Sequence, residues 1–197
     1  TPYLKPAKGN IVSELETELN IPVFIDNDSS LVALAELKFG KARNTKNTMV
    51  INIGWGVGLG MILNGELFRG HNRFAGEFSH IPIFTNNKIC GCGKSGCLET
   101  ETSLLVIIDK AIKGIKEGKS TSLKDISMDH PEAAAHSIIE AALHGDSFSI
   151  DLITEVGYNI GRGVAILIHI LNPELIVLSG RGSLAGRLWR APIQQAI

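Results

Sequence analysis

The chain has 197 residues, of which 44% are hydrophobic and 20% are charged, and its formal net charge is -1. This composition fits one ordinary globular domain or two small lobes that share a core, and it excludes disordered and fibrous proteins. The balanced charge leaves no basic surface for nucleic acid or for an anionic membrane. The apolar stretches are too short to cross a bilayer and residues 1–6 contain no secretory signal, so we expect a cytoplasmic protein without a membrane partner.

The first part of the chain is expected to form short helices and strands and then a hairpin. Apolar spacing places these elements, in chain order, at 13–19 (helix), 21–25 (buried strand), 29–39 (helix), 49–53 (strand), and 58–63 with 66–68 (hairpin strands). The hairpin prediction depends on Asn64-Gly65, since both positions of a tight hairpin turn favour positive φ.

The second part of the chain is mainly helical. Helices are expected at 104–116, 131–143, 147–171 and 188–197, and a buried strand of the parallel type is expected at 175–178. Early strands with a hairpin, later helices and a final strand followed by a helix indicate an α/β fold with a mixed sheet.

All three cysteines of the chain lie within eight residues, at Cys90, Cys92 and Cys97. Three thiols cannot all pair as disulfides, and in a reducing cytoplasm such a cluster favours a metal site. Zn²⁺ takes four tetrahedral nitrogen or sulfur ligands, and His80, ten residues before Cys90, is the candidate for the fourth. The alternative is that the cysteines are small buried hydrophobic residues in a glycine-rich loop.

Two further segments carry polar or glycine patterns. Asn27-Asp28 follows the strand expected at 21–25 and opens the next helix, where a carboxylate would lie at the edge of the sheet. Asp28 also suits the N-cap of that helix, which is the structural alternative. Glycine occupies every second position from 54 to 60, so one face of an extended chain lacks side chains and admits a ligand, typically phosphate. This segment matches neither a Walker A loop nor a dinucleotide-binding fingerprint.

Taken together, these segments resemble the ROK family (repressor, open reading frame, kinase), which groups bacterial sugar kinases with sugar-responsive repressors. The resemblance runs from Val23 to about Ser183 and rests on five motifs. These are Ile25-Asp26-Asn27-Asp28, the glycines from Gly54, Ala75-Gly76-Glu77-Phe78-Ser79-His80, the cysteine cluster continuing as Cys97-Leu98-Glu99, and Leu171-Asn172-Pro173-Glu174. The family has the two-lobed actin-like sugar kinase fold with a ribonuclease H-like core. The resemblance implies that residues 1–40 form the end of the first lobe and the hinge, and that 41–197 form most of the second lobe, truncated at its C-terminus.

The resemblance also implies a role for each candidate site residue. Sugar hydroxyls would be bound by Asn27, Asp28, Glu77, His80 and Glu99, and a structural zinc by His80, Cys90, Cys92 and Cys97. In a kinase of this family, Asp28 would be the general base. Gly54, Gly56 and Gly58 would then face the phosphates of Mg-ATP.

Three departures from the kinase pattern favour a regulator. Trp55 stands where kinases have a threonine between two glycines, Arg181 follows Gly180 where kinases have a second glycine, and Ser29-Ser30 replaces Ala-Asn. We therefore expect the sugar-sensing domain of a transcriptional regulator that forms a dimer or tetramer and binds DNA through a helix-turn-helix preceding Thr1. The alternatives are an ATP-dependent sugar kinase and a zinc-stabilised sugar-binding module with neither activity.

Overall fold

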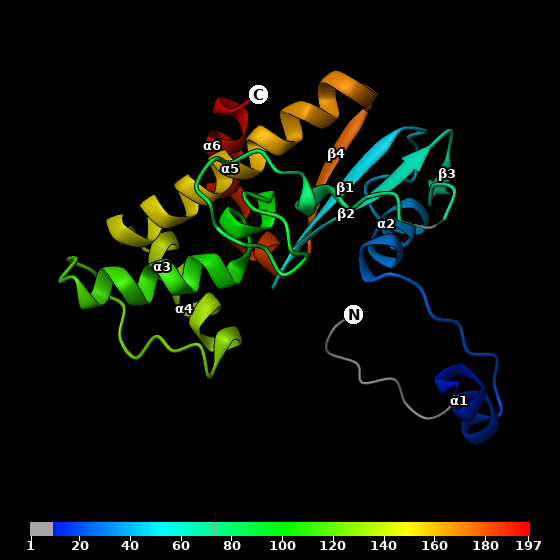
Figure 1. The fold of residues 1–197 in the computed structure, drawn as a ribbon, viewed down its shortest axis with the longest axis horizontal. Coiled ribbons are helices and arrows are strands. Elements are labelled where there is room, and N and C mark those ends of the chain that lie inside the picture. The colour runs from blue at the N-terminus through cyan, green and yellow to red at the C-terminus, as the bar shows by residue number, and fades with distance from the viewer. Residues whose placement is uncertain (1–9, 73) are drawn as a thin grey trace.

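A mixed four-stranded sheet lies at the centre of the computed structural model, which describes residues 10–72 and 74–197 (Figure 1). Its strand order is β3-β2-β1-β4. The strands are β1 (Thr48–Ile53), β2 (Val57–Leu63), β3 (Glu66–Phe68) and β4 (Leu175–Ser179). β2 is antiparallel to both of its neighbours, whereas β4 is parallel to β1. The predicted α/β class with a mixed sheet is confirmed. Residues 1–9, which begin the predicted 1–40 segment, lie outside the described residues.

The predicted hairpin is confirmed in position and in turn chemistry. Asn64 and Gly65 connect β2 to β3 with φ values of 56° and 81°. Positive φ at both positions is the requirement that favours Asn-Gly in a two-residue turn. The Gly65 N–H donates to the Lys46 carbonyl at 2.8 Å, which holds the turn against the segment that leads into β1.

Helices cover both faces of the sheet (Figure 1). One face carries α2 (Asp28–Lys38), and the other carries the long helices α3 (Leu104–Lys116), α4 (Pro131–Leu143) and α5 (Ser147–Leu171) with the short α6 (Arg190–Gln195). The bounds of α3, α4 and α5 are those predicted. Helix α1 (Ile11–Leu19) lies apart from this body and has no buried residue. Among the described residues, no helix is both long and apolar enough to cross a bilayer.

Two separate apolar cores form because alternate residues of β1 point to opposite faces of the sheet. Met49, Ile51 and Ile53 belong to the large core beneath α3, α4 and α5. Val50 belongs to the smaller core, which Ala33 of α2 completes. None of these side chains is exposed to solvent. The alternation of side chains along β1 therefore determines which helices pack on each face of the sheet.

Two glycines of β2 allow α2 to pack closely on the sheet. A Cβ atom at Gly58 would lie 1.9 Å from Ser29 Oγ, and one at Gly60 would lie 2.4 Å from Ala33 Cβ. Any side chain at these positions would push the helix away. This close approach fixes the start of α2, and with it Asn27-Asp28, at the end of the sheet.

Three predicted elements differ in the structure. The strand expected at 21–25 is absent: Phe24 is 91% exposed, because no described strand lies beside this segment to accept its backbone hydrogen bonds. β4 is the edge strand, so only Val177 of it is buried, although its apolar composition predicted full burial. The helix expected at 188–197 is divided into the 3-10 helix η3 (Arg181–Trp189) and α6, since Pro192 lacks a backbone N–H and suits only the first turn of a helix.

Candidate metal centre and ligand cavity

The four predicted metal ligands meet at one point. His80 ends the 3-10 helix η1 (Phe78–His80), and Cys97 immediately precedes η2 (Leu98–Glu101). The ligand atoms of His80, Cys90, Cys92 and Cys97 all lie within 4.8 Å of one another. His80 Nδ1 is 3.5 Å from Cys90 Sγ, and Cys92 Sγ is 3.6 Å from Cys97 Sγ.

The loop between the two 3-10 helices curls because glycine permits positive φ. Gly93 has φ 87° and Gly96 has φ 72°. The Cys90 N–H donates to the Lys94 carbonyl at 2.8 Å, and the Gly93 N–H donates to the Cys90 carbonyl at 2.9 Å. A Cβ atom at Gly96 would lie 1.9 Å from the Phe84 carbonyl oxygen, so only glycine fits there. These constraints bring the cysteines together, and we name residues 81–97 the metal loop.

The thiols of the cluster differ in their surroundings. Burial raises the pKa of Cys90, and it raises the pKa of Cys97 to about 12. The backbone N–H of Lys94 is the main cause that lowers the pKa of Cys92, which is exposed. Buried thiolates need a compensating cation, and a divalent ion at the centre of the cluster would supply it.

The arrangement fits zinc. Four tetrahedral ligands with Zn–S distances of 2.3 Å place sulfur atoms about 3.8 Å apart, close to the 3.6 Å between Cys92 and Cys97. The donor set of three thiolates and one imidazole is a closed set, which is typical of a structural rather than a catalytic zinc. The residues that would hold the ion are therefore the four that the sequence predicts.

A cavity of about 710 Å³ adjoins this cluster, and we name it the ligand cavity. It lies between the start of α2, the turn from β1 to β2, and the two 3-10 helices. Its lining includes every sugar-binding residue predicted from the sequence and all three predicted phosphate-facing glycines, namely Asn27, Asp28, Glu77, His80, Glu99, Gly54, Gly56 and Gly58. These residues come from four separate parts of the sequence and meet in one space.

Asn27, rather than Asp28, caps α2. The Asn27 Oδ1 atom accepts hydrogen bonds from the backbone N–H groups of Ser29 and Ser30. Asp28 is the first residue of the helix, and its Oδ1 accepts from the Ser29 N–H at 2.7 Å. The N-cap role that the sequence suggested for Asp28 is therefore filled by Asn27. A carboxylate in the first helical turn is favoured by the helix dipole.

His80 has one ring nitrogen for each part of the site. Nδ1 faces the thiol of Cys90, whereas Nε2 lies 3.6 Å from a carboxylate oxygen of Glu77. Glu99 also approaches the cysteine cluster, with its Oε1 atom 3.8 Å from Cys90 Sγ. Its Oε2 occupies the space that a side chain at Gly56 would need, since a Cβ there would lie 2.7 Å away. The metal cluster therefore supports the wall of the ligand cavity directly.

One contact in the cavity was not predicted from the sequence. The guanidinium group of Arg181 lies 5.4 Å from the ring centroid of Trp55 and forms an ion pair with Glu132 of α4. Trp55 and Arg181 both line the cavity. The sequence shows each as a separate departure from the kinase pattern, but residues so far apart in the chain reveal their contact only once the strands are placed.

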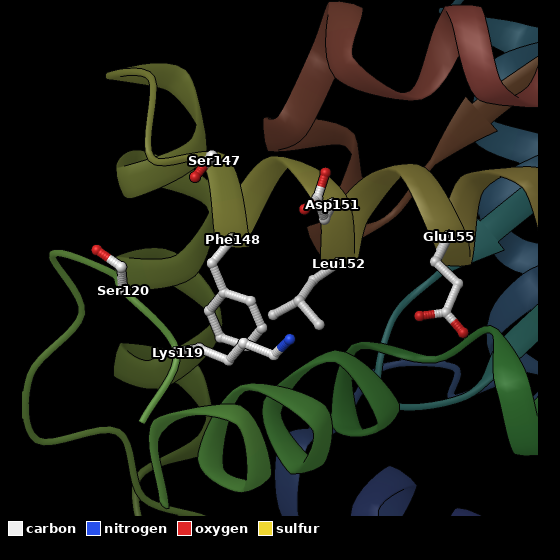
Figure 2. Close-up of a pocket in the computed structure, with 7 residues that line it drawn as sticks. All are labelled: Lys119, Ser120, Ser147, Phe148, Asp151, Leu152 and Glu155. Carbon is white, nitrogen blue, oxygen red and sulfur yellow. The ribbon is translucent and has the colours of Figure 1, made fainter. Parts of the chain in front are cut away.

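Asn52 is another cavity residue that sequence reasoning missed. It lies in β1, and its amide donates to Ser29 Oγ at 3.3 Å. A single polar residue inside an apolar strand gives no signal of its function. A smaller hollow of about 280 Å³ lies between α5 and the segment that follows α3 (Figure 2).

The whole chain, residues 1–197, matches the profile of the ROK family. The chain belongs to the ROK family. Among curated ROK proteins it is 37% identical to a glucokinase of Halalkalibacterium halodurans over 92% of this chain and 56% of the relative. It is 34% identical to a xylose repressor of Caldicellulosiruptor bescii over 100% of this chain and 49% of the relative. The chain thus spans about half the length of the curated relatives that it matches.

Solved structures also include both kinds of ROK protein. A ROK family transcriptional regulator, described as a homologue of the E. coli MLC protein, is 33% identical, with a TM-score of 0.82 over 95% of this chain and 46% of that one. A ROK glucokinase from Streptomyces griseus, solved with glucose and AMPPNP, is 29% identical, with a TM-score of 0.85 over 94% of this chain and 61% of that one. Family membership and the actin-like sugar kinase fold are therefore shown.

Proposed function

We propose that this chain is the sugar-sensing part of a ROK transcriptional regulator, which binds a hexose or an amino sugar beside a structural zinc. Overall similarity does not separate regulators from kinases, because both occur among the relatives at comparable identity. The observation that carries the proposal is the contact between Trp55 and Arg181 inside the ligand cavity.

The chemistry of the cavity suits a polyhydroxylated ligand. Sugar hydroxyls both donate and accept hydrogen bonds, and a carboxylate can accept from two of them at once. Asp28, Glu77 and Glu99 offer three such carboxylates, and Asn27 adds an amide that can donate. A zinc ion held by His80 and the cysteines would supply no reactive group and would hold the metal loop in the conformation that presents Glu99.

The contact between Trp55 and Arg181 is unfavourable for a nucleotide. In the kinase pattern, a small residue at position 55 leaves the backbone open to the phosphates, and a glycine at position 181 leaves it open to the adenosine. Here an indole ring and a guanidinium group occupy the same end of the cavity, and Glu132 neutralises the charge of Arg181. A triphosphate would have to displace this group of side chains. A monosaccharide at the Asp28 end of the cavity would not.

In a regulator, sugar binding has to alter the placement of DNA-binding segments. A sugar held between Asn27-Asp28 and the metal loop would favour one arrangement of the two lobes over another, which is a shift of population. The DNA-binding region would lie outside this chain. We expect a dimer or tetramer to convert this shift into a change in operator affinity.

The test is a binding and turnover assay on the intact protein with a panel of hexoses and N-acetylated amino sugars. We expect at least one sugar to bind in calorimetry, and we expect no sugar-dependent release of ADP from Mg-ATP. Asp28→Asn is expected to weaken sugar binding by about 1.5–3 kcal/mol, since hydrogen bonds to a charged acceptor contribute that amount. Asp109→Asn, an exposed change on α3, is the control. The regulator proposal fails if wild-type protein releases ADP in response to a sugar.

The second candidate function is an ATP-dependent sugar kinase. It is favoured by Asp28, which lines the cavity together with Gly54 and Gly56, as the general base and phosphate-facing residues of a kinase would. In that case Mg-ATP supplies the phosphoryl group, and Asp28→Asn would abolish turnover while sugar binding weakens only in part. A sugar-binding module with neither activity would bind sugar without ADP release and without any effect of the sugar on DNA binding.

A further inference from the structure

Glu101 is a buried carboxylate outside the ligand cavity. It is the last residue of η2, two positions after Glu99, and only 6% of its surface is exposed. Removing a carboxylate from water is costly unless charged and hydrogen-bonding groups surround it. The groups that surround Glu101 therefore show which parts of the molecule its buried carboxylate links.

The two carboxylate oxygens of Glu101 face different parts of the molecule. Oε1 accepts a hydrogen bond from the Asn86 amide and lies 2.6 Å from Lys88 Nζ, and both of these residues belong to the metal loop. Oε2 lies 3.5 Å from Nζ of Lys110 on α3. Lys110 in turn pairs with Glu155 of α5, which lines the small hollow shown in Figure 2.

The beginning of the metal loop is held by a separate contact. The guanidinium group of Arg162 on α5 donates to the Ile83 carbonyl at 3.1 Å and lies 4.6 Å from the ring centroid of Phe84. Within the loop, the Gly96 N–H donates to the Lys88 carbonyl at 2.9 Å. Arg162 thus holds the loop near residue 83, and Glu101 holds it near residue 88, just before the first cysteine.

We propose that Glu101 is a positioning residue, which fixes the metal loop to the helical layer and thereby sets the place of the metal cluster and of Glu99 in the ligand cavity. This inference rests on the proposed function for its effect on sugar binding, but not for its effect on the loop. Lys110 retains Glu155 as a partner without Glu101, and Lys88 is half exposed. The charge of Glu101 is therefore needed for the bridge rather than for neutralising either lysine.

The decisive variant is Glu101→Gln, which keeps the size of the side chain and an oxygen acceptor for Asn86 but removes the charge. We expect the amides of residues 86–97 to exchange hydrogen faster, while those of β1 and β2 keep their wild-type rates. We also expect sugar affinity to fall about tenfold, which is the effect of losing one hydrogen bond to a charged acceptor such as Glu99. Glu155→Gln, which leaves the bridge from Glu101 to the loop in place, is the matched control and should change neither quantity.

A double-mutant cycle with Lys88→Met tests whether the effect passes through the bridge. If it does, the double variant should resemble either single variant, because each removes the same connection. Additive effects, or wild-type exchange rates in Glu101→Gln, would overturn the inference. Lys88→Met also tests the connection by itself if Glu101→Gln does not fold. If the wild-type protein binds no sugar, the proposed function fails, while the exchange rates still decide the role of Glu101.

Discussion

Among the four candidate metal ligands, Cys92 is the exposed cysteine and the one whose thiol has a lowered pKa. We expect Cys92→Ser to reduce bound zinc from one ion per chain to a trace, since a hydroxyl is a poor substitute for a thiolate. Elemental analysis after dialysis measures this. Ser95→Ala, on the same loop and also exposed, should retain full zinc content. Unchanged zinc in Cys92→Ser would show that the cluster does not hold the ion.

Single residues also show what could be predicted at the site. The proximity of the three cysteines could be predicted from the sequence, because the segment that joins them is short. The ten residues from His80 to Cys90 could keep the two apart, and it is the backbone bridge between Pro82 and Cys97 that brings His80 to the cluster. The contact between Trp55 and Arg181 depends instead on the parallel pairing of β1 with β4, which no local pattern specifies. The same holds for Glu101 and its partner Lys110.

At the level of elements, α5 depends on the side chain that begins it. Burial alone would raise the pKa of Asp146, but hydrogen bonds from the N–H groups of Ser122 and Ser149 and from the Thr121 hydroxyl outweigh burial and hold the pKa well below its usual range. A carboxyl group with a depressed pKa stabilises the folded state above its unfolded pKa of 3.8, and this contribution is lost as the pH falls below that value.

We therefore expect Asp146→Ala to lower the free energy of unfolding at pH 7 by about 1–2 kcal/mol, the usual cost of losing an N-cap. Urea unfolding measures this value. The difference between the variant and the wild type should shrink as the pH is lowered below 3.8, because the carboxyl group of the unfolded wild type then takes up a proton while that of the folded state stays ionised. Asp151→Ala, an exposed change on the same helix, is the control. A difference that stays constant with pH would contradict the role of the charge.

Elements with local start and stop signals were predicted well, and so was the position of β4, but the strand at 21–25 and the full burial of β4 were not confirmed. Ser103 and Asp146 cap α3 and α5, and Asn172 ends α5 with positive φ, so their bounds follow from the adjacent residues. The segment 21–25 has the composition of a strand, but a strand exists only beside another strand, and none lies there among the described residues. β4 is only partly buried because it forms the edge of the described sheet and lacks a second neighbouring strand there.

At the scale of the whole molecule, the ligand cavity lies at one end of the sheet, between the start of α2 and the two 3-10 helices. Asn27-Asp28 comes from the α2 side, Gly54 to Gly58 from the β1–β2 turn, and Arg181 from the segment after β4. Because these parts converge on one space, a sugar at the Asp28 end would lie in the same cavity as Trp55. Binding should therefore be detectable from a probe that is built into the cavity wall.

The chain contains two tryptophans, and they report on different places. Trp55 lines the ligand cavity, whereas Trp189 is 1% exposed and its indole N–H donates to the Gly182 carbonyl at 2.6 Å. We expect a bound sugar to change the fluorescence of wild-type protein and expect Trp55→Phe to lose this change. Calorimetry on Trp55→Phe, in which we expect sugar binding to persist, separates the loss of the probe from the loss of the site. A full fluorescence response in Trp55→Phe would place the sugar near Trp189 and away from the cavity, because the only remaining indole lies in the core between η3 and α5.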